Sequence, residues 1–114
     1  MSTTVNTRQV ADITVVDVVG RITLGEGSSA LAETVRTQLT QGNRKLLLNL
    51  GEVTYMDSAG IGELVAAYSA VSQKGGRLKL LSNKRIQELL QITRLNTLFE
   101  AYAEEEQAIQ SFGT

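Results

Sequence analysis

The sequence predicts an α/β fold, with a central mixed sheet of four or five mainly parallel strands and about four helices. Segments rich in β-branched residues alternate with segments whose apolar residues recur every three or four positions, as expected when helices pack on a parallel sheet. Residues 46–50 form a short, almost entirely apolar run, which is typical of a strand buried on both faces. The length of 114 residues suits a single domain spanning residues 1–114.

The chain begins with a predicted β-hairpin. Residues 13–24 are rich in Val, Ile and Thr and poor in helix formers, which predicts a strand. A shorter strand is expected to end at Val10, with Ala11 and Asp12 in the turn. Gly20 lies inside the longer strand and predicts a bulge or a bend. The hairpin would add an antiparallel edge to the sheet.

Two helices flank the buried strand. The first is expected over residues 28–41, capped by Ser28 or Ser29, and the second over residues 58–74, after a loop at residues 51–57. Each helix carries an apolar stripe at helical spacing. The stripes consist of Leu31, Val35 and Leu39 in the first helix and of Ile61, Leu64, Val65, Tyr68 and Val71 in the second.

The C-terminal third continues the alternation of strands and helices. Residues 77–81 are a predicted strand, and residues 84–92 a short helix. Residues 98–99 are expected to be a short strand or a packed loop. A last helix is expected over residues 103–112, with three Glu residues in its first turn, where acids complement the helix dipole.

The composition excludes several kinds of chemistry. The chain has no Cys and no His, so disulfides, thiolate nucleophiles, Ser–His pairs and His-ligated metals are impossible. A net charge of −1 and an aromatic content of 4% argue against a nucleic-acid binder. The N-terminal segment lacks the apolar stretch of a secretory signal, and no apolar run approaches the ~20 residues of a membrane span. We expect a cytoplasmic protein without membrane insertion and without a metal or cofactor.

Three features have both a functional and a structural interpretation. Gly25, Glu26 and Gly27 precede a helix and resemble a phosphate cradle, but no Lys follows, so a flexible turn is favoured. The carboxylates have no spacing that gathers several oxygens around one metal ion. Lys84 and Arg85 begin a helix and could face a phosphate, although a solvated pair on an exposed turn is favoured.

The strongest local feature is the entry to the second helix, at residues 55–62. Asp57 and Ser58 both suit the N-cap position. Ser58 has no Glu or Gln three residues later, so it cannot form a capping box. Small neighbours would let another molecule approach the backbone here. They are Ala59, Gly60 and Gly62.

One face of the second helix is smooth and uncharged. Between Ser58 and Gln73 the only charged residue is Glu63, whereas an exposed helix face ordinarily carries several charges. Such a face suits either a docking partner or the protein's own neighbouring helix, and the residues alone leave both open. It consists of Gly62, Ala66, Ser69, Ala70 and Gln73.

Residues 49–60, which read Asn-Leu-Gly-Glu-Val-Thr-Tyr-Met-Asp-Ser-Ala-Gly, resemble the phosphorylation-site segment of STAS-domain anti-sigma factor antagonists. The resemblance covers about residues 8–112, with supporting matches at residues 19–22, 75–78, 89–95 and 98–99. The chain departs from the family pattern in three places. Ala59 stands where many members have a second Ser, Arg94 stands where Gly is common, and residues 25–27 replace a more helical start.

The resemblance implies a role in bacterial transcription regulation by partner switching, with no catalysis by this protein. The unphosphorylated antagonist would bind an ATP-dependent anti-sigma factor serine kinase and free the sigma factor. Phosphorylation of Ser58 would end that interaction, and a PP2C-type phosphatase would restore it. The free protein is expected to be a monomer. The implied partner-binding residues are Asp57, Ala59, Gly60, Gly62, Ala66 and Ser69, together with Gly25, Glu26 and Gly27.

Other STAS roles remain open at this point. The domain could be a scaffold subunit of a stress-sensing complex or an accessory subunit of a lipid transporter. It could also be a nucleotide-binding STAS module, although the chain has no phosphate-loop lysine.

Overall fold

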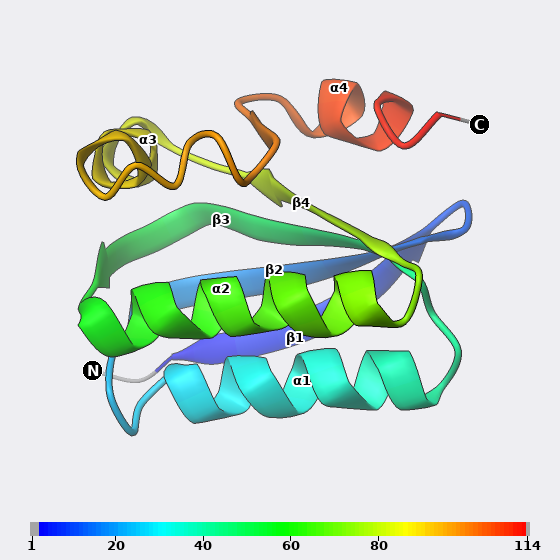
Figure 1. Cartoon of the computed structure of the whole chain (residues 1–114), viewed down its shortest axis with the longest axis horizontal. Coiled ribbons are helices and arrows are strands. Elements are labelled where there is room, and N and C mark those ends of the chain that lie inside the picture. Colours follow the sequence, from blue (N-terminus) through cyan, green and yellow to red (C-terminus); the bar gives the residue numbers. More distant parts are fainter. Residues whose placement is uncertain (1–2, 114) are drawn as a thin grey trace.

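The strands pair in chain order, β1-β2-β3-β4-β5, to form one mixed sheet (Figure 1). β1 and β2 are antiparallel, and each later pair is parallel. The computed structural model describes residues 3–113 and confirms the predicted α/β fold. Its strands are β1 (Thr4–Val10), β2 (Ile13–Ile22), β3 (Lys45–Met56), β4 (Arg77–Leu81) and β5 (Ala101–Tyr102). Its helices are α1 (Ser28–Thr40), α2 (Ser58–Gln73), α3 (Lys84–Ile92) and α4 (Glu105–Gln110).

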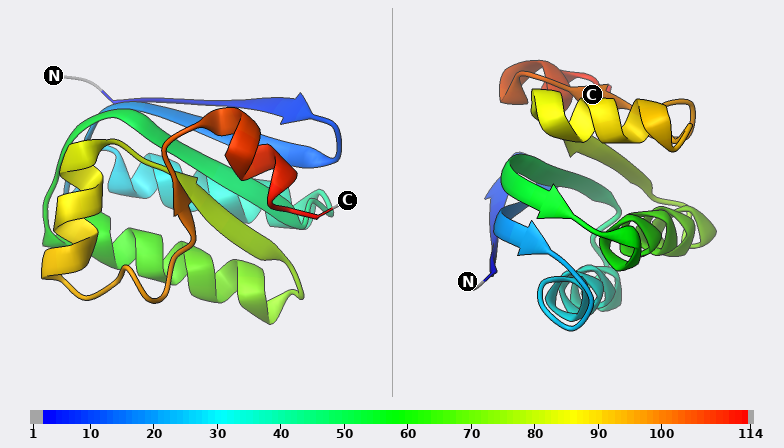
Figure 2. Two further views of the ribbon diagram at one scale, coloured as in Figure 1. Left: turned by 90° about the horizontal axis from the view of Figure 1, so that it is seen from above. Right: turned by 90° about the vertical axis from the view of Figure 1, so that its left-hand side faces the viewer.

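The alternation of side chains along the strands divides the core between the two faces of the sheet. α1 and α2 lie side by side on one face, and α4 lies on the other (Figures 1 and 2). Leu46 and Leu48 of β3 belong to the larger cluster beneath α1 and α2, whereas Leu47 belongs to the smaller cluster with Ala108 and Phe112. β3 is therefore buried on both faces, as its apolar run predicts.

The predicted loop at residues 51–57 is wrong, because β3 continues to Met56. Its second half pairs with the end of β2, from Val19 opposite Glu52 to Ile22 opposite Met56. The pairing register between β2 and β3 shifts between Asp17 and Val19 and again between Gly20 and Arg21. Gly20 has a φ of 108°, so the predicted bulge is confirmed. The polar residues that suggested a loop lie on the exposed side of an irregular strand.

Two other local expectations are also wrong, and one alternative is decided. Neither Ser28 nor Ser29 caps α1; its N-cap is Gly27, which makes no side-chain hydrogen bond. Residues 98–99 form a turn, in which both backbone N–H groups donate to the carbonyl of Leu95, and Phe99 is buried in the core, so the packed loop is confirmed and the alternative of a short strand is not. α4 begins at Glu105 instead of residue 103, because residues 101–102 pair with β4 and keep the chain extended.

The apolar stripe predicted for α2 faces the core. Leu64 and Val71 are fully buried, and Ala67, which the stripe omitted, is buried beside them. The remaining stripe residues are half-buried and pack against the same cluster. They are Ile61, Val65 and Tyr68.

The polar side chain of Asn83 ties the start of α3 to β3. Asn83 caps the helix, since its Oδ1 accepts a hydrogen bond from the Ile86 N–H at 2.8 Å. Its Nδ2 donates to backbone carbonyls of β3 at Leu50, Gly51 and Val53. After α3 the chain turns at Arg94, whose φ of 63° is the conformation that glycine adopts more easily.

Candidate functional site

Ser58 is exposed at the first residue of α2, where the chain leaves the end of β3 (Figure 1). Its hydroxyl therefore lies at the positive end of the helix dipole. This end of α2 also lies beside the loop after β2, because both parallel strands end at the same edge of the sheet. The fold thus presents Ser58 at the edge where the loops following β2 and β3 meet.

Asp57 joins the start of α2 to the loop after β2. Its Oδ1 accepts a hydrogen bond from the Gly60 N–H at 3.0 Å, so Asp57, rather than Ser58, is the N-cap. Its Oδ2 accepts a second bond from the Leu24 N–H at 3.1 Å. These two backbone donors, first Gly60 and then Leu24, lower the pKa of the Asp57 carboxyl below its usual value. Asp57 is therefore ionised at neutral pH and leaves the Ser58 hydroxyl out of the capping role.

Gly60 and Gly62 serve different purposes although both were predicted to bind a partner. Gly60 is buried, and a Cβ there would lie 2.3 Å from the carbonyl oxygen of Ile22. Gly60 therefore lets α2 approach the end of β2 closely. Gly62 is exposed with open space around its Cα, so it belongs to the accessible surface.

The loop at residues 25–27 lies next to this helix start, because Leu24 is hydrogen-bonded to Asp57. Gly25 and Glu26 are exposed, whereas Gly27 is buried, and a Cβ on Gly27 would lie 2.5 Å from the carbonyl oxygen of Arg21. Gly27 thus shapes the loop, and Gly25 and Glu26 are the members that a partner can reach.

Three exposed apolar side chains flank the site and are absent from the predicted set. Leu24 is 80% exposed beside Asp57, and Tyr55 is half exposed two residues before it. Ile92, which is 78% exposed, and Tyr55 both line a hollow of about 210 Å³ between β3 and α3. The sequence signal for them is weak: Ile92 is an apolar residue in a helix whose buried positions are Ile86 and Leu90.

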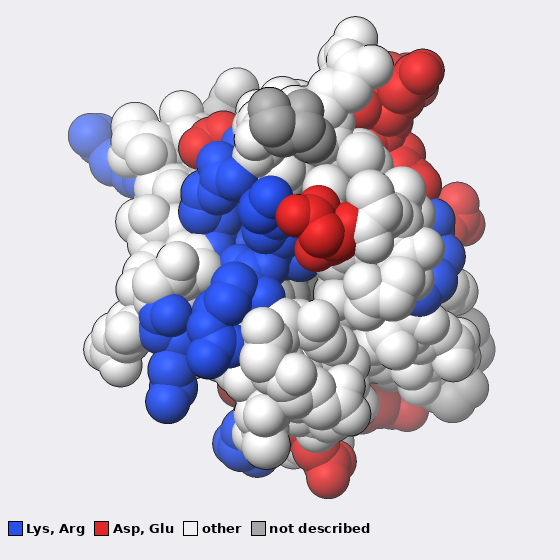
Figure 3. Space-filling view, turned by 90° about the vertical axis from the view of Figure 1, so that its right-hand side faces the viewer, with Lys and Arg blue, Asp and Glu red and all other residues white. Residues whose placement is uncertain are grey.

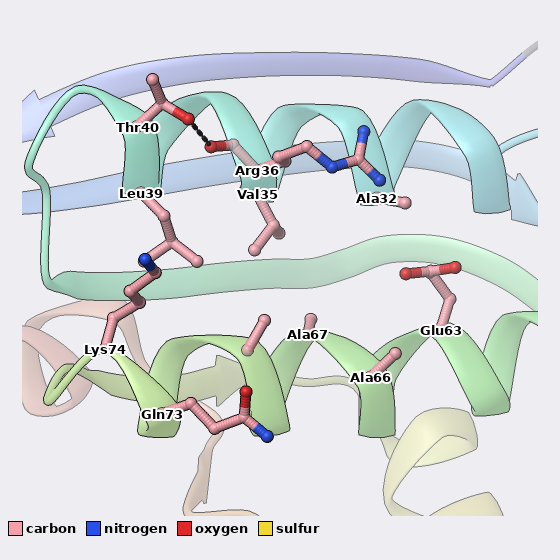
Figure 4. Close-up of a pocket in the computed structure, with 11 residues that line it drawn as sticks. Ala32, Val35, Arg36, Leu39, Thr40, Glu63, Ala66, Ala67, Gln73 and Lys74 are labelled. Carbon is pink, nitrogen blue, oxygen red and sulfur yellow. Dashed lines mark hydrogen bonds between the residues drawn. The ribbon is translucent and has the colours of Figure 1, made fainter.

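The smooth face of α2 is accessible. Gly62, Ala66, Ser69 and Gln73 are exposed, which excludes packing of most of this face against the neighbouring helix, whereas Ala70 is half-buried and packs against the core. Beside it, small side chains leave a groove of about 420 Å³ between α1 and α2, floored by Val35, Leu39 and Ala67 (Figure 4). Ala66 and Ala70 form one wall of the groove, and Glu63 and Lys74 lie toward its two ends.

Within residues 3–113 no cluster of three or more acidic side chains is arranged to hold a metal ion. In the same part of the chain, no helix combines the length and the apolar character needed to cross a membrane. Lys84 and Arg85 are exposed on the first turn of α3.

The close contact at Gly60 predicts opposite effects for two alanine substitutions on α2. Gly60→Ala should lower the free energy of unfolding by about 1–3 kcal/mol, because the new methyl group collides with the Ile22 carbonyl. Gly62→Ala should raise it by roughly 0.5–1 kcal/mol, because alanine favours a helix and the position is open. Urea unfolding of both variants measures the difference. Equal effects would contradict the packing described for α2.

The lowered pKa of Asp57 predicts a pH-dependent contribution to stability. Asp57→Asn keeps an N-cap acceptor but removes the charge, so the variant should be less stable than the wild type at pH 7. The folded-state pKa lies below the unfolded value of about 3.9, so the difference should shrink as the pH falls from there through the folded-state pKa. Urea unfolding over a pH series measures the difference in free energy of unfolding between the wild type and the variant. A difference that does not change with pH would contradict the prediction.

Comparisons of sequence agree on one group of proteins. The family model described as the STAS domain matches residues 4–108. The chain is 34% identical over 73 residues to the anti-sigma-B factor antagonist of Bacillus subtilis, an alignment that covers 63% of this chain and 67% of that protein. It is 40% identical over 68 residues to the anti-sigma-B factor antagonist of Staphylococcus aureus, covering 58% of this chain and 63% of that protein. The chain thus aligns with about two thirds of the length of these relatives.

Comparisons of structure extend over nearly the whole chain. An anti-sigma factor antagonist from Mycobacterium paratuberculosis superposes with a TM-score of 0.86 at 20% identity, covering 96% of this chain and 93% of that one. The anti-sigma factor antagonist SpoIIAA in its unphosphorylated form superposes with a TM-score of 0.74 at 20% identity, covering 97% and 100%. Its phosphorylated form gives 0.73 at 20% identity, covering 96% and 99%. The fold is shared with these proteins, and the family match over residues 4–108 shows that this chain belongs to the STAS domain family.

Proposed function

We propose that this protein is an anti-sigma factor antagonist that binds an anti-sigma factor serine kinase and is switched off by phosphorylation of Ser58. The observation that carries the proposal is an exposed serine at the first position of α2, beside an ionised Asp57, in a STAS domain whose curated relatives are anti-sigma factor antagonists. The kinase would use ATP, and a PP2C-type phosphatase would reverse the modification. The protein itself would act as a substrate and binding module.

The position of Ser58 suits a modification that leaves the fold intact. The hydroxyl is exposed and is not the helix cap, so a phosphate replaces no hydrogen bond described for the folded state. A phosphoserine carries about −1.5 to −2 charges at pH 7. At a helix N-terminus the dipole favours such an anion by ~0.3–1 kcal/mol.

The same phosphate would oppose a docked partner. Binding over Ser58 requires that the phosphate lose water close to the Asp57 carboxylate. Like charges brought together at an interface cost several kcal/mol. Each ~1.4 kcal/mol lowers affinity tenfold, so one phosphate is enough to switch binding.

The proposed docking surface surrounds Ser58 on α2 and the neighbouring loop. Gly62, Ala66 and Ser69 offer a smooth helix face, and Gly25 and Glu26 form its border. Asp57, Ala59, Gly60 and Gly27 would act by holding the backbone around Ser58. Exposed apolar side chains add the desolvated anchors that stabilise interfaces. They are Leu24, Tyr55 and Ile92.

The proposed function is tested by isolating the partner. Tagged wild-type protein and Ser58→Glu serve as baits in an extract of the source bacterium, and proteins retained by the wild type alone are identified by mass spectrometry. A captured serine kinase is then purified and mixed with the protein, ATP and Mg²⁺. We expect phosphate on Ser58 alone. A purified partner that leaves Ser58 unmodified would overturn the proposed switch.

Substitutions at Ser58 should separate binding from phosphorylation. Ser58→Asp and Ser58→Glu should melt like the wild type and bind the kinase at least about tenfold more weakly, because a charge enters the interface. Ser58→Ala should bind like the wild type and resist phosphorylation. The measurements are a thermal melt and a binding titration. Unchanged affinity of both acidic variants would rule out a charge switch.

Bulk on the smooth face should block the partner without unfolding the domain. Ala66 is exposed two turns from Ser58, so Ala66→Arg should weaken kinase binding by ~1–3 kcal/mol, as overpacking does in a close contact. Arginine favours a helix, so the melting temperature should change little. Ser72→Arg is the matched control, because Ser72 is exposed on the same helix but lies off this face. Equal binding by both variants would show that the face is only solvated.

A further inference from the structure

Positive charge gathers at the end of the molecule where α1 and α2 finish, whereas Ser58 lies at the start of α2 (Figures 1 and 3). The two longest stretches of the chain without an acidic residue are residues 34–51 and residues 64–87, and each runs through the C-terminal end of a helix into a strand. α1 and α2 point the same way, so the cations that directly follow each helix, at residues 44–45 and at residues 74–79, lie at the same end of the molecule (Figure 1). We call this surface the basic end. It consists of the exposed Lys74 and Arg77, the half-buried Arg44 and Lys45, and Lys79, which is buried beneath them.

Contacts between neighbouring strands hold these residues together. Lys45 lies opposite Arg77 in the pairing of β3 with β4, and the Arg77 N–H donates to the Arg44 carbonyl at 2.7 Å. Lys74 follows α2 directly, at the mouth of the groove between the helices. The basic end is therefore built on the rigid ends of the sheet and helices.

Ion pairs and helix dipoles within the protein compensate only part of this positive charge. Lys45 pairs with Asp12 at 2.7 Å, and Lys79 pairs with Glu100 at 3.0 Å. The Arg44 guanidinium donates to the Leu39 carbonyl at the end of α1. The two helix dipoles contribute about −0.5 charge each at their C-termini. Five cations against two acids and these dipoles still leave roughly +2 on one end of a protein whose net charge is −1.

We propose that the basic end is a second docking surface, which binds an acidic segment of a protein partner regardless of the phosphorylation state of Ser58. Lysine and arginine pair with single carboxylates, and the arginine fork does so with two parallel hydrogen bonds. Carboxylates spaced along a peptide can pair with these cations while avoiding Asp12, which lies among them. The binding of an acidic segment to the basic end does not depend on the proposed function. The claim that this binding is unaffected by phosphorylation of Ser58 does rest on the proposed function.

Membranes and nucleic acids fit the basic end less well. The exposed large apolar side chains of the described residues are Val19, Leu24, Tyr55 and Ile92, and none belongs to the basic end, so a lipid surface finds no apolar anchor there. Phe112 lies under Arg77 and Lys79 but is fully buried, so it offers no stacking platform for a base.

The distance along α2 separates the two surfaces electrostatically. Lys74 follows Ser58 by sixteen positions, which corresponds to about 24 Å at the helical rise of about 1.5 Å per residue. The Debye length at physiological salt is about 8 Å, so the charge of a phosphate at Ser58 is largely screened at the basic end. Phosphorylation would therefore release one partner while leaving the other in place.

A labelled peptide of alternating Glu and Ala tests the proposal by fluorescence anisotropy at low ionic strength. Lys45→Gln/Lys74→Gln should weaken binding on the order of three- to tenfold, because it removes two ammonium groups of the basic end, the exposed Lys74 and the half-buried Lys45. Lys84→Gln/Arg85→Gln is the matched control, since it removes the same charge from the start of α3 and should change binding less than twofold. Lys74→Gln alone, at an exposed position, guards against unfolding of the double variant and should show part of the loss.

Several outcomes would overturn the proposal. Equal weakening by the two double variants would show that only net charge matters, and absence of peptide binding would show that the basic end takes no acidic segment. Tighter binding of phosphatidylserine vesicles or duplex DNA than of the peptide, lost in the same variant, would assign the surface to those ligands instead. Ser58→Glu should bind the peptide like the wild type, and a loss as large as that of Lys45→Gln/Lys74→Gln would overturn the independence from phosphorylation. Failure of the proposed kinase switch would appear separately, in kinase binding by Ser58→Glu.

Discussion

The junction of β2 with α2 is the constraint on which the site depends. The Ile22 carbonyl accepts the Asp57 N–H and lies against Gly60, which has no side chain to keep it away. The Asp57 carboxylate then joins the Leu24 and Gly60 N–H groups. Strand end, loop and helix start are thereby fixed relative to one another. Ser58 follows directly on this junction, so its position is set by these backbone contacts and by the Asp57 carboxylate.

Asp57 and Ser58 are adjacent in the chain but have different roles. Asp57 satisfies the helix N-terminus, and it does so as an anion, because two backbone donors lower its pKa. Ser58 carries no structural hydrogen bond that a modification must break. A group at position 58 can therefore change charge while the cap remains in place. The residue that stabilises the fold and the residue that would switch the interface are adjacent but separate.

The sequence predicts the fold and the helix start well because both depend on local pattern. The stripe on α2, the apolar run of β3 and the Asp57–Ser58 boundary are visible in single segments. The second half of β3 was missed because its pairing with β2 passes through a bulge and exposes polar residues such as Glu52 and Thr54. Exposure of Leu24 and Ile92, and the bonds from Asn83 to β3, arise from contacts between distant segments that no local pattern records.

The parallel course of α1 and α2 explains why the molecule has two chemically different ends. Each βαβ connection returns the chain to the same edge of the sheet, so both helices begin at one end and finish at the other. Their N-termini favour anions, and Asp57 and Ser58 lie there. Their C-termini favour cations, and Arg44 and Lys74 lie there. A phosphate at the first end is stabilised by the same dipole whose other end supports positive charge, so the architecture allows the two surfaces to carry different partners without sharing a residue.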